Sequence, residues 1–377
     1  MFSEYNIYVR NKDGKFTNNL TAVESVDIIE RINDPGSWTI KSQTKEQCPF
    51  SEGDGIVITR NGDAYYSGVA KELNEVYDAY SRLYTWTIKG VGDLEFLNRR
   101  VCYPDPSTGE TTVDAHYEDS GPMGEVIKRI IDRNLGVDAM PDRRDMMIAE
   151  TAVIDAGTSI SVSLRFQTIL KAIIPLLESQ GYIIRTVWDE SIKKIVYKIY
   201  KGIDNSGIMV FSTALNSILS MEFNMKVPTG NYVISGGQGE MTDRAFAYAW
   251  DDSSIGQWGR IEYFHDMRST EAADLQTDAD ITLAEFAEEN IGYSSEINSA
   301  DYQTSYKKSW NIGDYVAVFV RGRKFVQRVM QVETKLSYGN ETITPTIGTI
   351  KQGQLMKIFD SLGQLRSDVD QLQGIGN

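Results

Sequence analysis

A short β-rich segment occurs twice in this chain. Seven residues of an N-terminal stretch recur near the C-terminus in the same order, at one constant offset and without a gap. The matched pairs are Gly53/Gly313, Asp54/Asp314, Ile56/Val316, Ile58/Val318, Gly62/Gly322, Tyr65/Phe325 and Val69/Val329. Glycine and aspartate are typical of turns, and alternating apolar residues are typical of strands. We therefore predict two similar small β-barrel domains. Their predicted turn residues are Gly53, Asp54, Gly62, Gly313, Asp314 and Gly322.

An earlier segment repeats as well. Residues 25–40 align with residues 220–234 after a single gap. The pairs include Ser25/Ser220, Val26/Met221, Ile28/Phe223, Arg31/Lys226, Gly36/Gly230, Trp38/Tyr232 and Ile40/Ile234. The second copy is longer between the two matched regions, which predicts an insertion at about residues 240–305. Two copies are too few for a solenoid, which needs at least three stacked units, so a duplicated β domain is favoured.

Residues 98–215 are predicted to form a separate α+β domain. An apolar stripe at Val126–Leu135 has the 3.6-residue period of an amphipathic helix. A second stripe, residues 169–177, contains Pro175, which we expect to kink the helix or mark its end. Strands are predicted at 182–188 and 194–200.

The predicted fold class is α+β and mainly β. It combines two similar small β-barrel domains, an α+β module, an inserted mixed domain and a C-terminal coiled-coil helix. The predicted domains are residues 1–97, the first barrel; 98–215, the α+β domain; 216–239 with 306–350, the second barrel; 240–305, the insertion, with strands near its start and a helix around residues 281–287; and 351–377, the terminal helix.

The C-terminus carries a short heptad pattern. Its apolar residues are spaced alternately by three and four, as at the a and d positions of a coiled coil. They are Leu355, Ile358, Leu362, Leu365, Val369 and Leu372. So short a helix is marginal alone, and Gly363 costs about 1 kcal/mol relative to Ala. We expect the strip to be buried by self-association of several copies, with docking onto the rest of the chain as the alternative.

Charge and composition exclude several classes of protein. The formal net charge is −15, which argues against nucleic acid or an anionic membrane as the main ligand, because both need clustered Lys and Arg. No apolar run is long enough to span a membrane, and the N-terminus does not resemble a secretory signal. The two cysteines, Cys48 and Cys102, have no metal-binding spacing and are expected to be reduced thiols.

Residues that could carry catalysis are few. His116 and His265 belong to no metal motif, and a Cys102–His116 nucleophilic pair has no support from spacing. The glycine-rich residues 236–240 lack the frame of a phosphate-binding loop and are expected to form a flexible or closely packed loop. The acidic pairs Glu118-Asp119 and Asp251-Asp252 are expected to be solvated surface, with a cation site as the alternative. We predict no catalytic, metal or cofactor site.

The order of the motifs resembles the tail-hub family of siphophages, which forms the N-terminal part of tail-associated lysins and is similar to contractile-tail baseplate hubs. The matching segments are Trp38-Thr39-Ile40, Gly53-Asp54, Ser67-Gly68, Tyr200-Lys201-Gly202-Ile203-Asp204, Phe211-Ser212, Asn216-Ser217-Ile218, Ser235-Gly236-Gly237, Arg260-Ile261-Glu262 and Asn311-Ile312-Gly313-Asp314-Tyr315-Val316. They span nearly the whole chain, although each is short.

The resemblance implies a structural virion protein at the distal tail tip. Two similar barrels from each of three subunits would alternate around a ring and match the sixfold tail above. The implied partners are two further copies of the chain, the distal tail ring protein, the tape-measure protein and other tail-tip or fibre proteins. DNA would be met only in passage, and we expect no direct membrane insertion and no cofactor.

Tail-associated lysins often continue into a cell-wall-degrading domain. This chain stops at Asn377, directly after the heptad pattern, so the resemblance carries over no enzymatic activity, and we expect a complete short hub. The alternatives are the hub or spike base of a contractile tail or injection system, and a cell-wall hydrolase or carbohydrate-binding tail-tip protein.

Overall fold

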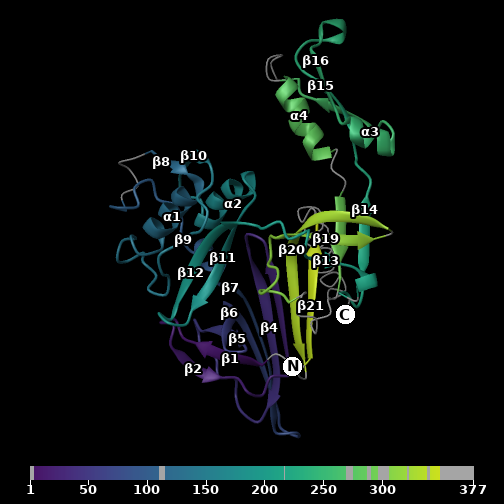
Figure 1. Cartoon of the computed structure of the whole chain (residues 1–377). Coiled ribbons are helices and arrows are strands. Elements are labelled where there is room, and N and C mark those ends of the chain that lie inside the picture. Colours follow the sequence, from purple (N-terminus) through teal and green to yellow (C-terminus); the bar gives the residue numbers. More distant parts are fainter. Residues whose placement is uncertain are drawn as a thin grey trace, which may run out of the picture. The chain divides into compact units, whose positions relative to one another are not determined.

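The computed structural model describes residues 4–109, 115–215, 217–268, 275–286, 290–295, 305–320, 322–337 and 340–348 (Figure 1). Two compact units make up the chain. The first comprises residues 1–221 and 295–347, and the second is described over parts of residues 222–294. The predicted heptad residues 355–372 lie outside the described residues.

The first unit is built around one large sheet. Its N-terminal strands are β1 (Tyr5–Arg10), β2 (Phe16–Asn19), β3 (Ser25–Arg31), β4 (Asp34–Thr44), β5 (Gly55–Arg60), β6 (Asp63–Asp78) and β7 (Leu83–Gly92). Its C-terminal strands are β19 (Tyr315–Val320), β20 (Arg323–Ser337) and β21 (Asn340–Ile347), and the short β13 (Val210–Phe211) pairs parallel to β19. Within this unit the strand order is β2-β1-β5-β6-β7-β4-β3-β20-β21, and β19 also pairs with β20.

The predicted strands are present, but the described strands do not close into barrels. The N-terminal strands form an open path that ends at β3. The outer edge of β3 is hydrogen-bonded to β20, from Gln331 opposite Arg31 to Ser337 opposite Ser25. This pairing uses the edge that a closed barrel would have joined to β2 or β1. The two predicted domains therefore share one sheet in this unit, and the fold class is mainly β.

The segment between these strand sets contains both predicted helices. They are α1 (Met123–Asn134) and α2 (Ile169–Ser179), and Pro175 lies inside α2 rather than at its end. The short helix η1 (Asp93–Asn98) follows β7. Two small sheets complete the segment, and Figure 1 shows them beside the helices. Strand β8 (Tyr117–Pro122) pairs with β10 (Ser159–Leu164), and β11 (Tyr182–Asp189) pairs with β12 (Lys194–Lys201), which is joined by β9 (Ala152–Val153).

The α/β segment shares its core with the N-terminal strands. One cluster of buried side chains joins Val57 and Val69 of the large sheet to the apolar stripes of both helices and to β11 and β12. In α1 the buried stripe is Val126, Ile127, Ile130 and Ile131, the positions that a 3.6-residue period places on one face. Residues 98–215 are therefore not a module with a core of its own.

The second unit contains two small sheets and two helices. Strand β14 (Glu222–Lys226) pairs antiparallel with β18 (Asn290–Ser294). Strand β15 (Tyr232–Gly236) lies between β16 (Phe246–Trp250) and β17 (Glu262–Asp266), and the helices are α3 (Asp252–Trp258) and α4 (Leu275–Phe286). Two short helices, η2 (Thr213–Leu215) in the first unit and η3 (Met241–Asp243) here, complete the elements.

These pairings change the predicted position of the insertion. In the first copy β3 pairs with β4 as a hairpin. In the second copy the partner of β14 is β18, whereas β15 pairs with β16 and β17. By strand pairing, the chain inserted into the second copy is thus residues 227–289 rather than 240–305. The sequence alignment matched β15 to β4 because Tyr232 and Ile234 have the same alternation as Trp38 and Ile40.

Candidate assembly surfaces

The turn before β5 is held by the carboxylate of Asp54. Gly53 has a φ of +85°, a backbone conformation that favours glycine. The Asp54 carboxylate accepts a hydrogen bond of 2.8 Å from the backbone N–H of Ser51, and the N–H of Asp54 donates to the Ser51 carbonyl at 3.1 Å. Asp54 is buried, so its carboxylate depends on this hydrogen bond from the chain rather than on solvent.

The turn before β19 has the same hydrogen bonds. Gly313 has a φ of +86°. The Asp314 carboxylate accepts from the N–H of Asn311 at 2.9 Å, and the N–H of Asp314 donates to the Asn311 carbonyl at 3.2 Å. The repeated glycine and aspartate thus occupy equivalent places in two turns that share their hydrogen bonds.

Asp314 makes further contacts that Asp54 does not. Its carboxylate also accepts from the N–H of Ile203 at 3.0 Å and from the side-chain amide of Asn205 at 3.1 Å. These bonds fix the segment that enters β13, which then pairs with β19. The second copy of the turn has therefore become the anchor of a long connecting segment.

The hairpins that follow the two turns also correspond. Arg60 pairs with Asp63 across the β5–β6 turn, where Asn61 and Gly62 both have positive φ, as a type I′ turn requires. Val320 pairs with Arg323 across the β19–β20 turn, where Gly322 has a φ of +76°. The two turns therefore correspond, but the strand pairing beyond them differs by one residue. The β5–β6 pairing has a register shift between Ile58 and Thr59 that the β19–β20 pairing lacks, so Tyr66 rather than Tyr65 takes the place of Phe325.

Each long strand carries a β-bulge beyond its hairpin. In β6 the register with β7 shifts between Ala70 and Glu72, and in β20 the register with β21 shifts between Val329 and Gln331. Bulges bend a strand and increase its twist. The two bulges are therefore reference points for matching β6 to β20 residue by residue.

A buried polar cluster joins the two halves of the large sheet. Lys307 donates to the Glu30 carboxylate at 2.8 Å, and the Tyr306 hydroxyl donates to the same carboxylate at 3.0 Å. Burial lowers the pKa of Lys307 to about 8, against the opposing effect of Glu30. Tyr65 of β6 completes the cluster through a 2.9 Å hydrogen bond to Thr334 of β20.

A second ion pair in the same region joins β5 to β21. The Arg60 guanidinium lies 2.9 Å from the Glu341 carboxylate, and the Tyr5 hydroxyl donates to that carboxylate. Arg60 also lies over the Tyr5 ring at 5.8 Å. Both charged side chains are about 10% exposed, so the pair is largely buried. Neither cluster could be foreseen from the sequence, because its members are far apart along the chain and no spacing relates them.

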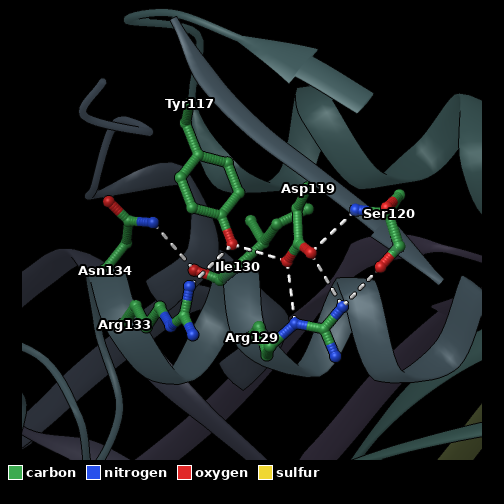
Figure 2. A network of polar contacts seen from close by, with 7 residues as sticks. All are labelled: Tyr117, Asp119, Ser120, Arg129, Ile130, Arg133 and Asn134. Carbon is green, nitrogen blue, oxygen red and sulfur yellow. Dashed lines mark hydrogen bonds and ion pairs between the residues drawn. The ribbon is translucent and has the colours of Figure 1, made fainter. Parts of the chain in front are cut away.

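Asp119, the second residue of the acidic pair Glu118-Asp119, is part of a structural network between β8 and α1 (Figure 2). The Asp119 carboxylate accepts two 2.8 Å hydrogen bonds from the Arg129 guanidinium and one of 2.7 Å from the Tyr117 hydroxyl. Burial and the hydrogen bond to Asp119 raise the pKa of Tyr117 to about 12. Burial acts to raise the pKa of Asp119, but the bonds from Arg129 and Tyr117 lower it overall. Asp119 is therefore committed to a fixed ion pair.

The other candidate residues have structural roles or differ in their exposure to solvent. Asp251 caps α3 by accepting from two backbone N–H groups. Cys102 is buried, and burial raises the pKa of its thiol to about 12, whereas His116 is exposed. The loop after Gly236 is held by Arg244, which donates to the carbonyls of Gly236 and Gly237.

The described residues contain neither a metal-binding cluster nor a membrane-spanning helix. No cluster of three or more histidine, cysteine, aspartate or glutamate side chains in the described ranges could hold a metal ion. In that same part of the chain, no helix is both long and apolar enough to cross a membrane.

Comparisons with known proteins identify the class. The structure is similar to the 43 kDa tail protein of prophage MuSo2 from Shewanella oneidensis, with a TM-score of 0.62, 11% identity, and coverage of 92% of this chain and 98% of that chain. It is also similar to the tail protein from Neisseria meningitidis MC58, with a TM-score of 0.56, 14% identity, and coverage of 92% and 97%. The fold is therefore that of phage tail proteins.

The family follows from the sequence itself. Residues 6–349 match the model of the Siphovirus ReqiPepy6 Gp37-like protein family, so the chain belongs to that family, as the predicted resemblance to siphophage tail proteins implied. A chain of the Francisella PdpA–VgrG complex in its lidded form is also similar, with a TM-score of 0.52 and 10% identity over 92% of this chain and 52% of that one. The comparison with curated proteins finds no match.

Proposed function

We propose that this protein is the hub that closes the distal end of a siphophage tail tube as a homotrimer. The observation that carries the proposal is the repeated turn and hairpin, in which Asp54 and Asp314 make the same local hydrogen bonds. Three chains with two equivalent hairpins each present six similar surfaces. A threefold assembly can then dock on a sixfold tail ring without unmatched interfaces.

In this proposal the protein has no enzymatic role. Its barrel-like strand sets bind the distal tail ring protein, its interior meets the tape-measure protein, and its opening after host contact releases that protein and the DNA. The net charge of −15 supports a passage in which acidic groups repel DNA phosphates, so that the polymer does not adhere.

The oligomeric mass tests this proposal. Light scattering after size-exclusion chromatography should give three times the 42.4 kDa chain mass. A monomer at micromolar concentration that gains no mass when the distal tail ring protein is added would contradict the hub.

The heptad residues are proposed as trimer contacts. Leu362→Asp together with Leu365→Asp should weaken trimerisation, because a charge at an a or d position is buried in the coiled coil. The matched control is Gln364→Asp with Ser367→Asp, which adds the same charge at two positions of the same helix that are neither a nor d positions. If the first pair leaves the mass unchanged, the terminal helix is not the source of the trimer.

The second candidate is the hub or spike base of a contractile tail or injection system. The similarity to the VgrG complex chain, over half of that chain's length, favours it. Binding to a purified tail ring from a contractile phage, and not to a siphophage ring, would select this alternative.

A further inference from the structure

Within the described part of the chain, no strand pairs with the outer edge of the far half of β6. Beyond the bulge, residues 72–78 pair with β7, whereas the pairing of β6 with β5 ends at Val69. Every residue from 71 to 80 is exposed, including Leu73 at 48%, Val76 at 60% and Tyr77 at 52%. An exposed edge with apolar side chains is a ready template for another strand.

The equivalent edge in the second copy is covered. Residues 331–337 of β20 pair with β21 on one side and with β3 on the other. Val332 and Thr334 are fully buried there. The bulges set the correspondence, since Gln331 follows the bulge of β20 as Glu72 follows that of β6. Leu73 and Glu75 therefore stand where Val332 and Thr334 stand.

The strand equivalent to β3 is β14. Strand β3 is antiparallel to β4, and β14 is antiparallel to β18. The repeat aligns Ile28 with Phe223 and Arg31 with Lys226. In the strand order, β14 stands at the end of its path. Among the described strands, the edge of β20 is thus occupied by β3, whereas the equivalent edge of β6, at residues 72–78, has no strand beside it.

We propose that β14 of a second copy of this chain pairs antiparallel with residues 72–78 of β6. This inference rests on the proposed homotrimeric hub and names the strands that join its subunits. The contact is head-to-tail, because β6 of one copy receives β14 of the next, and a head-to-tail contact can close into a ring. The added strand supplies main-chain hydrogen bonds in the manner of β-augmentation.

The register follows from the β3–β20 pairing. Thr334 faces Ile28 and Gln331 faces Arg31, so Glu75 is placed opposite Phe223 and Glu72 opposite Lys226. The same register sets Leu73 opposite Met225 and Tyr77 opposite Met221. Of these four pairs, one is of opposite charge and two are of apolar residues, which cross-strand pairing favours. The fourth, Glu75 with Phe223, belongs to neither kind.

Disulfide trapping tests the pairing in the full chain. In a Cys48→Ser background, Asn74→Cys with Asn224→Cys places two thiols directly opposite in the proposed register. We expect covalent dimers and trimers on a non-reducing gel, lost on reduction. The matched control is Thr87→Cys with Asn224→Cys, since Thr87 faces Asn74 from the other edge of β6 and lies beyond the reach of a disulfide.

The outcomes separate the pairing from the hub itself. A trimeric mass without the specific crosslink overturns the pairing and leaves the hub intact, as does equal crosslinking of the control. A crosslink within one chain also overturns it, because the occupant is then the chain's own β14. A monomeric mass overturns both proposals. As a second variant, Leu73→Lys with Tyr77→Lys should keep the monomer folded, since both residues are exposed, and raise the trimer dissociation constant at least tenfold. An unchanged dissociation constant would overturn the pairing.

Discussion

Replacing Asp54 or Asp314 by alanine should destabilise the protein to different extents, because the two aspartates accept different numbers of hydrogen bonds. Asp54 accepts one hydrogen bond from a backbone N–H, whereas Asp314 accepts that bond and two more, from Ile203 and Asn205. A hydrogen bond to a charged group contributes about 1.5–3 kcal/mol, and removing the acceptor leaves buried donors without a partner.

The expected magnitudes follow from these bonds. We expect Asp54→Ala to lower the free energy of unfolding by about 2 kcal/mol and Asp314→Ala by about 4 kcal/mol. Asp314 accepts three hydrogen bonds where Asp54 accepts one, but the losses of neighbouring bonds are not additive, so the second value is less than three times the first. Urea denaturation followed by tryptophan fluorescence measures both. Each variant is the control for the other, because the same substitution is made at equivalent positions of the two turns.

Hydrogen exchange adds a local measurement. A peptide covering residues 200–211 should exchange faster in Asp314→Ala, because its amides lose their anchor, and should be unchanged in Asp54→Ala. Equal destabilisation by the two substitutions, or unchanged exchange of residues 200–211 in Asp314→Ala, would refute the reasoning.

Two further predictions concern burial and backbone strain. The pKa of Lys307 is lowered to about 8 in the folded chain, so the unfolded chain binds more protons than the folded chain between pH 8 and 10. The free energy of unfolding should therefore rise by about 1.5 kcal/mol from pH 8 to 9.5, relative to the Lys307→Met variant. Parallel pH profiles of the two proteins in urea denaturation would contradict this. Gly53→Ala should cost about 1–2 kcal/mol for its positive φ. Gly313→Ala should cost more, because its Cβ would lie 1.9 Å from Ile183 Cδ1. In an Ile183→Ala background the two glycine changes should cost the same, and a persistent difference would mean that the clash is not the cause.

Helices, strands and turns could be predicted from the sequence more completely than the pairing of the strands could. The helix at Val126–Leu135 and the strands at 182–188 and 194–200 were predictable, because their periodicity is a property of consecutive residues. The turns at Asp54 and Asp314 were predictable for the same reason. Pro175 was expected to kink its helix or mark its end. It lies inside α2, so it does not end the helix, which the surrounding buried stripe stabilises.

The edges that pair were not predictable. The sequence indicates that β3 is a strand, but nothing in residues 25–31 names β20 as its neighbour. The insertion was misplaced because β15 has the same apolar alternation as β4. Only the pairing of β14 with β18 shows that β18, and not β15, takes the place of β4 in the second copy. The Lys307–Glu30 pair was missed because it is formed by residues far apart in the chain.

The pairing of β3 with β20 also has a consequence for synthesis. Arg31 and Gln331, which face each other in the sheet, are 300 positions apart. At about 5–20 residues per second, a ribosome would hold the N-terminal strands with a bare outer edge for about 15–60 s before their neighbour emerges. During that interval the nascent chain depends on chaperones, or on its own speed of completion, to avoid joining the wrong strand.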